Sequence, residues 1–152
     1  MTTQKKNNII FMDGKEKILQ KLFSSTEFGY LAVGYNNEQT ETNGFQNVDP
    51  NDEESTNGFM EISQVDSSTY SRVPLSFHSI VNKDDDTGKV TAKFTAELDI
   101  DNIIEDIPIN QIAIVDSSEV EDASTTFFAA SVTDTFSKNE KLALVFVIEI
   151  TM

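Results

Sequence analysis

The sequence predicts a mostly β fold, an antiparallel β-sandwich of about seven strands with one short N-terminal helix. Short apolar segments are separated by stretches rich in Asn, Asp, Ser and Thr, and several of these segments alternate apolar and polar residues as strands do. With 152 residues, 38% of them hydrophobic, the chain is long enough to bury one core. We therefore expect residues 13–152 to form a single domain.

The N-terminal part is predicted to be an arm followed by a helix. Residues 1–12 are expected to form a flexible arm that carries two basic residues, Lys5 and Lys6. Asp13 is expected to cap a helix over residues 14–23, because Asp is a preferred N-cap residue directly before an amphipathic pattern. This helix would pack its apolar face on the sandwich.

A buried strand and a long loop come next. Residues 28–35, FGYLAVGY, place aromatic and β-branched residues between glycines, which is typical of a buried strand. Residues 36–57 are too polar for a core strand, and a connection of about twenty residues without secondary structure is usually functional. Phe45 and Val48 are its sizeable apolar residues, so we expect them to make its contacts. Phe45 would anchor the loop to its own domain or to a neighbour.

Two strands are predicted between this loop and the middle of the chain, at residues 59–65 and 70–81. Pro74 lies inside the second and cannot donate to a ladder, which predicts an edge strand or a bulge there. Period-two spacing places these residues on one side of that strand: Val73, Leu75, Phe77 and Val81.

The second half of the chain predicts a hairpin turn and four strands. Residues 83–88, KDDDTG, are typical of a turn, and residues 90–98 then alternate apolar and polar side chains as a half-buried strand does. Residues 109–116 and 125–132 predict two strands separated by an acidic loop. Residues 142–150 are apolar on both faces, so this strand is expected to be central or covered.

Composition limits the partners. The formal net charge of −15 leaves few cations for phosphates, which disfavours nucleic acid and anionic membranes and fits a basic protein partner. The absence of Cys excludes disulfides and thiolate metal sites. No apolar run is long enough for a secretory signal or a membrane span, so a soluble chain without a cleaved signal is expected.

The sequence carries no specific catalytic or cofactor motif, so we predict neither an enzyme nor a cofactor. Its single histidine, His78, lies on the polar side of a predicted strand, where an exposed or structural role is expected. Neither phosphate-binding glycine motif, GxxxxGK[ST] or GxGxxG, occurs. Chance pairs among 26 acidic residues leave glycoside hydrolysis open without supporting it.

Two kinds of ligand site are weighed against simpler explanations. The acidic runs at residues 84–86, 52–54 and 116–122 could bind Ca²⁺, but none has the spacing of an EF-hand and solvated turns are the default. Exposed aromatic residues could form a carbohydrate platform, although aromatic residues at strand spacing are more often core. The aromatic candidates are Tyr30, Tyr35, Phe45, Phe59 and Tyr70.

The order of motifs resembles a family of tailed-bacteriophage tail and baseplate proteins, including the domain at the start of some tail-collar and tail-fibre chains. The resemblance spans about residues 15–150 through short motifs, which are GYLAVG (29–34), GFMEISQV (58–65), VTAKFTAEL (90–98), INQIAIVDS (109–117) and FFAASVTDTFSKNEKLALVFVIEI (127–150). Fibre proteins continue into long shafts beyond this region, whereas this chain ends at Met152. It therefore looks like a free-standing adaptor.

The resemblance implies a virion structural protein made in the host cytoplasm. It would occur as a symmetric homo-oligomer in the tail, neck, collar or baseplate and bind other virion proteins. We predict its interface at Lys5, Lys6, Phe45 and Val48. The alternatives are a capsid decoration or head-fibre protein, and a carbohydrate- or Ca²⁺-binding β-sandwich that recognises a host surface.

Overall fold

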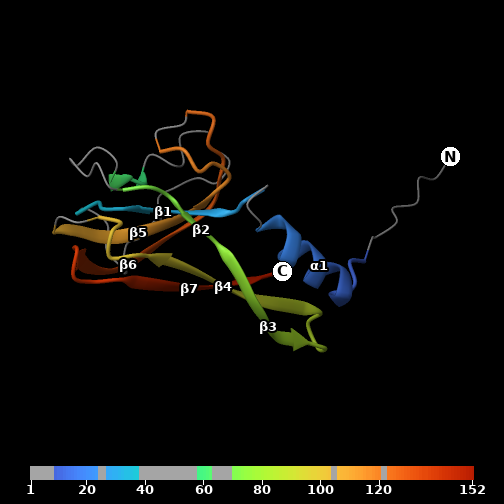
Figure 1. Ribbon diagram of the computed structural model, residues 1–152. Coiled ribbons are helices and arrows are strands. Elements are labelled where there is room, and N and C mark those ends of the chain that lie inside the picture. The colour runs from blue at the N-terminus through green and yellow to red at the C-terminus, as the bar shows by residue number, and fades with distance from the viewer. Residues whose placement is uncertain (1–8, 24–26, 38–57, 63–69, 104–105, 121–122) are drawn as a thin grey trace.

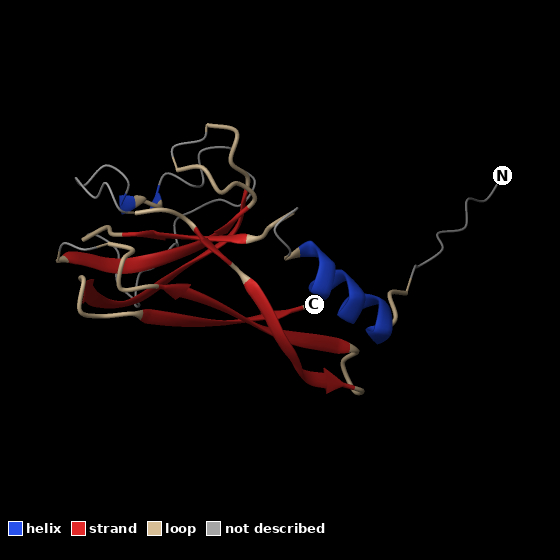
Figure 2. Ribbon diagram, viewed as in Figure 1, coloured by secondary structure: helices blue, strands red, loops and turns tan. Residues whose placement is uncertain are grey.

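The chain folds into two antiparallel sheets with one helix at their side (Figures 1 and 2). The structure, a computed structural model, describes residues 9–23, 27–37, 58–62, 70–103, 106–120 and 123–152. The elements are α1 (Met12–Leu22), β1 (Tyr30–Gly34), β2 (Val73–Pro74), β3 (Ser76–Asp84), β4 (Lys89–Leu98), β5 (Ile107–Val115), β6 (Phe127–Lys138) and β7 (Leu144–Thr151). One sheet has the order β2-β1-β5-β6 and the other β3-β4-β7. The predicted fold class, with seven strands and one short helix, is confirmed.

The helix α1 forms as predicted but begins earlier, so the predicted cap is wrong. The N-cap is Phe11, which makes no side-chain cap, and Asp13 lies inside the first turn. There its carboxylate lies near the positive end of the helix dipole and 3.4 Å from the Lys83 ammonium. Leu19 and Phe23 are fully buried, and the Phe23 ring meets the Phe94 ring edge-on, so the apolar face covers β4.

The strand predicted at residues 28–35 is β1, which lies inside the four-stranded sheet between β2 and β5. The strand predicted at residues 59–65 is wrong for its described part. Within residues 58–62 only Glu61 forms a bridge, to Gly34. Its neighbour Met60 donates its N–H to a side-chain amide of β5 instead of to a ladder, which ends the pairing after one residue.

The strand predicted at residues 70–81 is divided between the two sheets. The chain leaves the first sheet after Pro74 and enters the second at Ser76, and β2 and β3 are both edge strands. The edge position inferred from Pro74 is confirmed. Phe77 lies opposite the buried Phe94, on the predicted side of the strand, but is partly exposed at the sheet edge. Val81 follows two register shifts between β3 and β4, which break the period-two pattern, and it is exposed.

The hairpin β3-β4 and the alternation of β4 agree with the sequence. Asp84 accepts the N–H groups of Asp86 and Thr87 at the turn, and Gly88 supplies a φ of 69° there. The apolar residues of β4 are buried against the helix and the opposite sheet: Val90, Ala92, Phe94, Ala96 and Leu98.

The last strand, β7, corrects the prediction of a central or covered position. It forms the edge of the three-stranded sheet, and only its inward face is shielded, so Val145 and Val147 are exposed. In contrast, β5 lies between β1 and β6 and is mostly buried. Among the described residues, no helix has the length and hydropathy needed to cross a membrane.

Candidate functional site: a polar base beneath the long loop

The predicted interface residues Lys5, Lys6, Phe45 and Val48 lie outside the described residues, as do most of the predicted arm and most of the loop at 36–57. The structure does describe where both segments join the domain. The arm joins α1 through residues 9–11, and the loop leaves β1 after Gly34 and returns at Gly58. The base of the loop is therefore the part of the candidate site that can be built from side chains.

The two ends of the loop are bonded to each other. The Asn36 side-chain amide donates to the Gly58 carbonyl at 3.2 Å, and the Tyr35 N–H donates to the Met60 carbonyl at 2.9 Å. The described ends of the predicted loop are therefore held next to each other.

Two buried amides of β5 hold these ends. Asn110 accepts the Asn36 N–H at 2.9 Å and donates to the Asn36 carbonyl at 2.8 Å. Gln111 accepts the Met60 N–H at 3.0 Å and donates to the Gly58 carbonyl at 2.7 Å. Both side chains are almost fully buried, where an amide is stable only if it is hydrogen-bonded.

Gly34 is required by this arrangement. A Cβ at this position would lie 2.4 Å from the Met60 carbonyl oxygen and 3.1 Å from Gln111 Oε1. The backbone of the returning segment therefore lies directly against β1, on the side not paired with β5, and only glycine leaves room for it.

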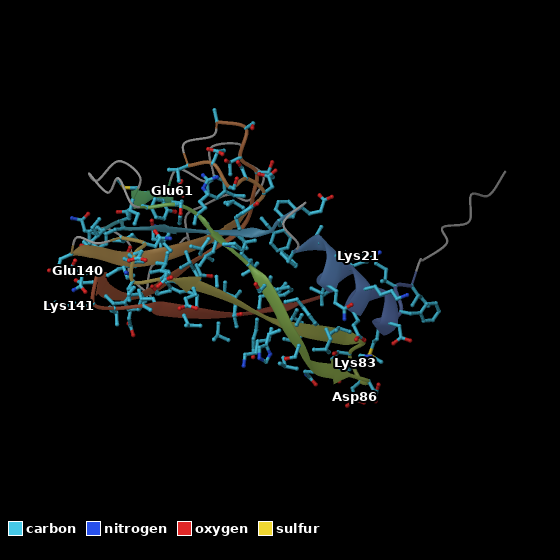
Figure 3. The ribbon with its side chains drawn as sticks, viewed as in Figure 1. Lys21, Glu61, Lys83, Asp86, Glu140 and Lys141 are labelled. Carbon is cyan, nitrogen blue, oxygen red and sulfur yellow. The ribbon has the colours of Figure 1, made fainter. Side chains whose placement is uncertain are left out.

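A second polar cluster fixes the other side of the same segment. The Arg72 guanidinium binds both carboxylate oxygens of Glu61, at 2.9 Å each, and the Tyr70 hydroxyl donates to Glu61 Oε2 at 2.7 Å. The Tyr70 oxygen in turn accepts the Val33 N–H at 3.1 Å. Figure 3 places Glu61 beside the four-stranded sheet, far from the hairpin tip marked by Lys83 and Asp86.

This cluster also reaches the acidic loop between β5 and β6. Arg72 donates to the Ser117 carbonyl at 3.0 Å and to Thr125 Oγ1 at 2.9 Å. Burial raises the pKa of the Tyr70 phenol well above its usual value, and the neighbouring Glu61 carboxylate raises it further. The cluster therefore joins residues 58–62, residues 70–72 and the loop between β5 and β6. The Glu61 carboxylate is hydrogen-bonded to Arg72 and Tyr70 within it.

Sequence reasoning missed both clusters, although one signal for them was present. Asn110 and Gln111 interrupt an otherwise apolar strand, INQIAIV, and adjacent polar residues in a buried strand must find partners. The Glu61–Arg72 pair has no such local signal, because its members are paired only once residues 58–62 and β2 are placed side by side.

His78 and the acidic turn at residues 84–86 lie away from the base of the loop. His78 is exposed on β3, as predicted, with its Nδ1 3.0 Å from Ser79 Oγ. Hydrogen bonds from the Thr87 hydroxyl and from the backbone of Asp86 and Thr87 lower the pKa of Asp84, so this carboxylate serves the turn. In the described part of the chain, no three Asp, Glu or His side chains come together as metal ligands.

The described members of the predicted aromatic platform are packed within the fold. Tyr70 is buried, and the Phe59 ring meets the Phe127 ring edge-on with centroids 5.6 Å apart. Tyr30 packs around the small apolar cluster near Phe59, whereas Tyr35 packs against the main core. These residues therefore fill two cores instead of lining one open surface, and Phe45 lies outside the described residues.

One buried cation lies away from the loop base. Lys138, at the end of β6, donates to the Asn139 carbonyl at 2.7 Å and to the Ile103 carbonyl at 3.2 Å. Ile103 has a φ of 67°, which is a strained conformation for a β-branched residue. Burial lowers the pKa of Lys138, and the charges of Asp99 and Asp101 oppose this shift. The ammonium thus helps hold a strained turn.

Comparison with known proteins gives no relative for this chain: no protein-family model matches it, and no curated protein and no solved structure matches significantly. Its function therefore has to be inferred from its own residues.

Proposed function

We propose that this chain is a non-enzymatic assembly protein that presents the loop at 36–57 to neighbouring protein chains. In its specific form, the proposal is a multi-copy adaptor in the tail, neck, collar or baseplate of a tailed-bacteriophage virion. The observation that carries the assembly role is the polar base, in which Asn110 and Gln111 hold both ends of the loop. The phage setting rests on the order of motifs in the sequence.

The polar base suits presentation of a binding loop because it fixes where the loop starts and ends. Fixing the ends before binding lowers the entropy that a partner must remove when it orders the loop. Two buried amides and a buried ion pair lie beneath this one connection, although burying polar and charged groups costs free energy of desolvation. Binding loops on rigid scaffolds are a common arrangement.

Surface charge supports a protein partner. The net charge of −15 would repel nucleic acid, while it would attract a basic protein surface. The loop itself carries acidic residues around its apolar Phe45 and Val48, so a basic partner with an apolar pocket would match it.

The phage setting is tested by imaging. Particles released from cells that make this protein would be labelled with gold-conjugated antibody against the folded domain. Label at one place on the tail, neck or baseplate is the expected result. Label on the capsid would support a decoration or head-fibre protein instead, and particles without label would contradict the virion role.

The loop's role is tested by a variant in which residues 38–57 are replaced by a short Gly/Ser linker. Because Asn36 and Gly58 remain, the base should close and the thermal unfolding midpoint should stay close to that of the wild type. Incorporation into particles should be lost. A second variant carries Phe45→Ser and Val48→Ser in a loop of full length, and it should also lose incorporation. Normal incorporation of both variants would exclude the loop as the docking element.

A further inference from the structure

Within the described residues, one edge of strand β7 is unpaired, and Glu149 is the only charged residue of the strand. Among the described residues β7 pairs only with β4, over its whole length and without a register shift. It contains no Pro, Gly or Lys, the residues that commonly prevent edge strands from pairing with other chains. The other edges differ, because β2 is two residues long and contains Pro74, and β3 and β6 carry register shifts.

The register shows which backbone groups face outward. Val90 and Met152 exchange two hydrogen bonds, of 3.0 and 2.9 Å, so they form a hydrogen-bonded pair between β4 and the end of β7. Such pairs alternate along an antiparallel ladder. The N–H and C=O groups of Val145, Val147 and Glu149 therefore point away from β4.

This edge is also apolar on its outer face. The side chains of Val145 and Val147 are 62% and 56% exposed, on the face of the sheet away from the core. Together with the outward backbone groups they form a template for an added strand, whose main chain would complete the ladder and whose apolar side chains would cover the two valines.

The segment before α1 has the properties of such a strand. Ile9, Ile10 and Phe11 are 77%, 55% and 76% exposed, which leaves three consecutive large apolar side chains without cover from the described residues. Phe11 is already in an extended conformation, and β-branched and aromatic residues favour strands. In Figure 1 this segment leads away from both sheets, toward the exterior of the molecule.

Charge favours another copy of the chain as the occupant. Residues 1–12 contain Lys5 and Lys6 and no acidic residue, whereas residues 13–152 contain the other 9 basic and all 26 acidic residues, a net charge of −17. The basic arm is thus attracted to the body of a neighbour. Direct pairing of two β7 edges would instead bring two acidic bodies together without this compensation.

We propose that the arm ending at Phe11 adds as an antiparallel strand to the β7 edge of a second copy. With Phe11 beside Val145 and Ile9 beside Val147, all four side chains share the outer face. The same register places Lys5 diagonal to Glu149 of the neighbour, within reach of a long side chain. This inference deepens the assembly role proposed above by naming one partner as the chain itself.

The experiment compares the oligomeric state of the full chain with variants of each side of the contact, by sedimentation across a range of concentrations. The wild type should self-associate, and less so at high salt because the arm's charge is screened. The arm variant Ile9→Ser/Phe11→Ser should weaken association at least about tenfold, which corresponds to about 1.4 kcal/mol. Ile18→Ser, an exposed apolar position on α1, is its matched control and should leave association unchanged.

The edge variant is Val147→Pro. Proline removes an N–H that points away from β4, so the fold should survive and pairing with the arm should be lost, while Val147→Ala is the control for side-chain size. At a concentration at which the wild type is just associated, each variant alone should be mostly monomeric, but a mixture of the arm variant and the Val147→Pro variant should form dimers. One retains an intact edge and the other an intact arm.

Three results would overturn the proposal. They are a monomeric wild type at all concentrations, association that persists in the arm variant, or a mixture that stays monomeric although both variants are folded. The linker variant that lacks residues 38–57 should self-associate like the wild type. Failure of the arm contact would therefore leave the loop's role to be judged separately by incorporation into particles.

Discussion

Glu61 and Arg72 face each other through two hydrogen bonds of 2.9 Å, with both side chains nearly buried. Removing the guanidinium leaves a buried carboxylate without its cation, so Arg72→Met should lower the free energy of unfolding by about 3 kcal/mol. The double variant Glu61→Leu/Arg72→Met should lose clearly less. Urea denaturation of the wild type, both single variants and the double variant measures this coupling, and additive losses would show that the pair is not a unit.

The raised pKa of Tyr70 predicts that the protein loses stability at alkaline pH. Its pKa is raised in the folded state, so the stability that it contributes is fully present below its ordinary value of 10.0 and is lost as pH rises through the higher folded value. The difference in unfolding free energy between the wild type and Tyr70→Phe should therefore shrink above pH 10.0. The other tyrosines are common to both chains, and a difference that stays constant with pH would contradict the prediction.

Gln111→Leu should loosen the base of the loop. The substitution leaves the Met60 N–H without its partner, at a cost of about 1–3 kcal/mol, and it removes one of the two side-chain amides that donate to the Gly58 carbonyl. Limited proteolysis should then cut faster near Gly58. Ser131→Ala on β6, at an exposed position, is the control, and an unchanged cleavage rate in Gln111→Leu would show that this amide does not hold the segment.

The stability that depends on Lys138 should change with pH in the opposite direction to that of Tyr70, because the pKa of Lys138 is lowered in the folded state. Burial lowers its pKa in the folded state, so folding releases protons, and this group makes the protein more stable as pH rises from the folded value toward 10.5. Lys138→Met lacks this dependence. The stability of the wild type relative to Lys138→Met should therefore increase across that interval in denaturant titrations, and a decrease would mean that the ammonium is favoured where it lies.

Local patterns predicted some elements well, and the reasons differ from strand to strand. The alternation of residues 90–98 specifies β4 because one face of that strand meets the core and the other does not. The same logic misplaced β7, because apolar residues on both faces show only that both faces avoid charge. Whether another layer covers the face that carries Val145 and Val147, and whether the strand has a partner on each side, depends on the arrangement of the sheets, which periodicity does not contain.

The candidate site was less accessible to prediction for a related reason. Composition predicts a long loop at residues 36–57, but the base of this loop depends on contacts between residues far apart in sequence, such as Asn36 and Asn110. The sequence shows the adjacent polar residues Asn110 and Gln111 in β5, but it does not show which residues they bind. The flexible arm and its basic residues remain a prediction, which the proposed contact with the β7 edge makes testable.

The passage of one segment from the first sheet to the second bears on how the protein unfolds. Only Leu75 separates β2 from β3, and its N–H is bonded to the Gly29 carbonyl at 2.8 Å beside β1. Neither sheet can therefore come apart without pulling on a strand of the other. We expect hydrogen exchange at the most protected amides of β1 and β4 to occur through the same global opening, so that the two layers behave as one cooperative unit.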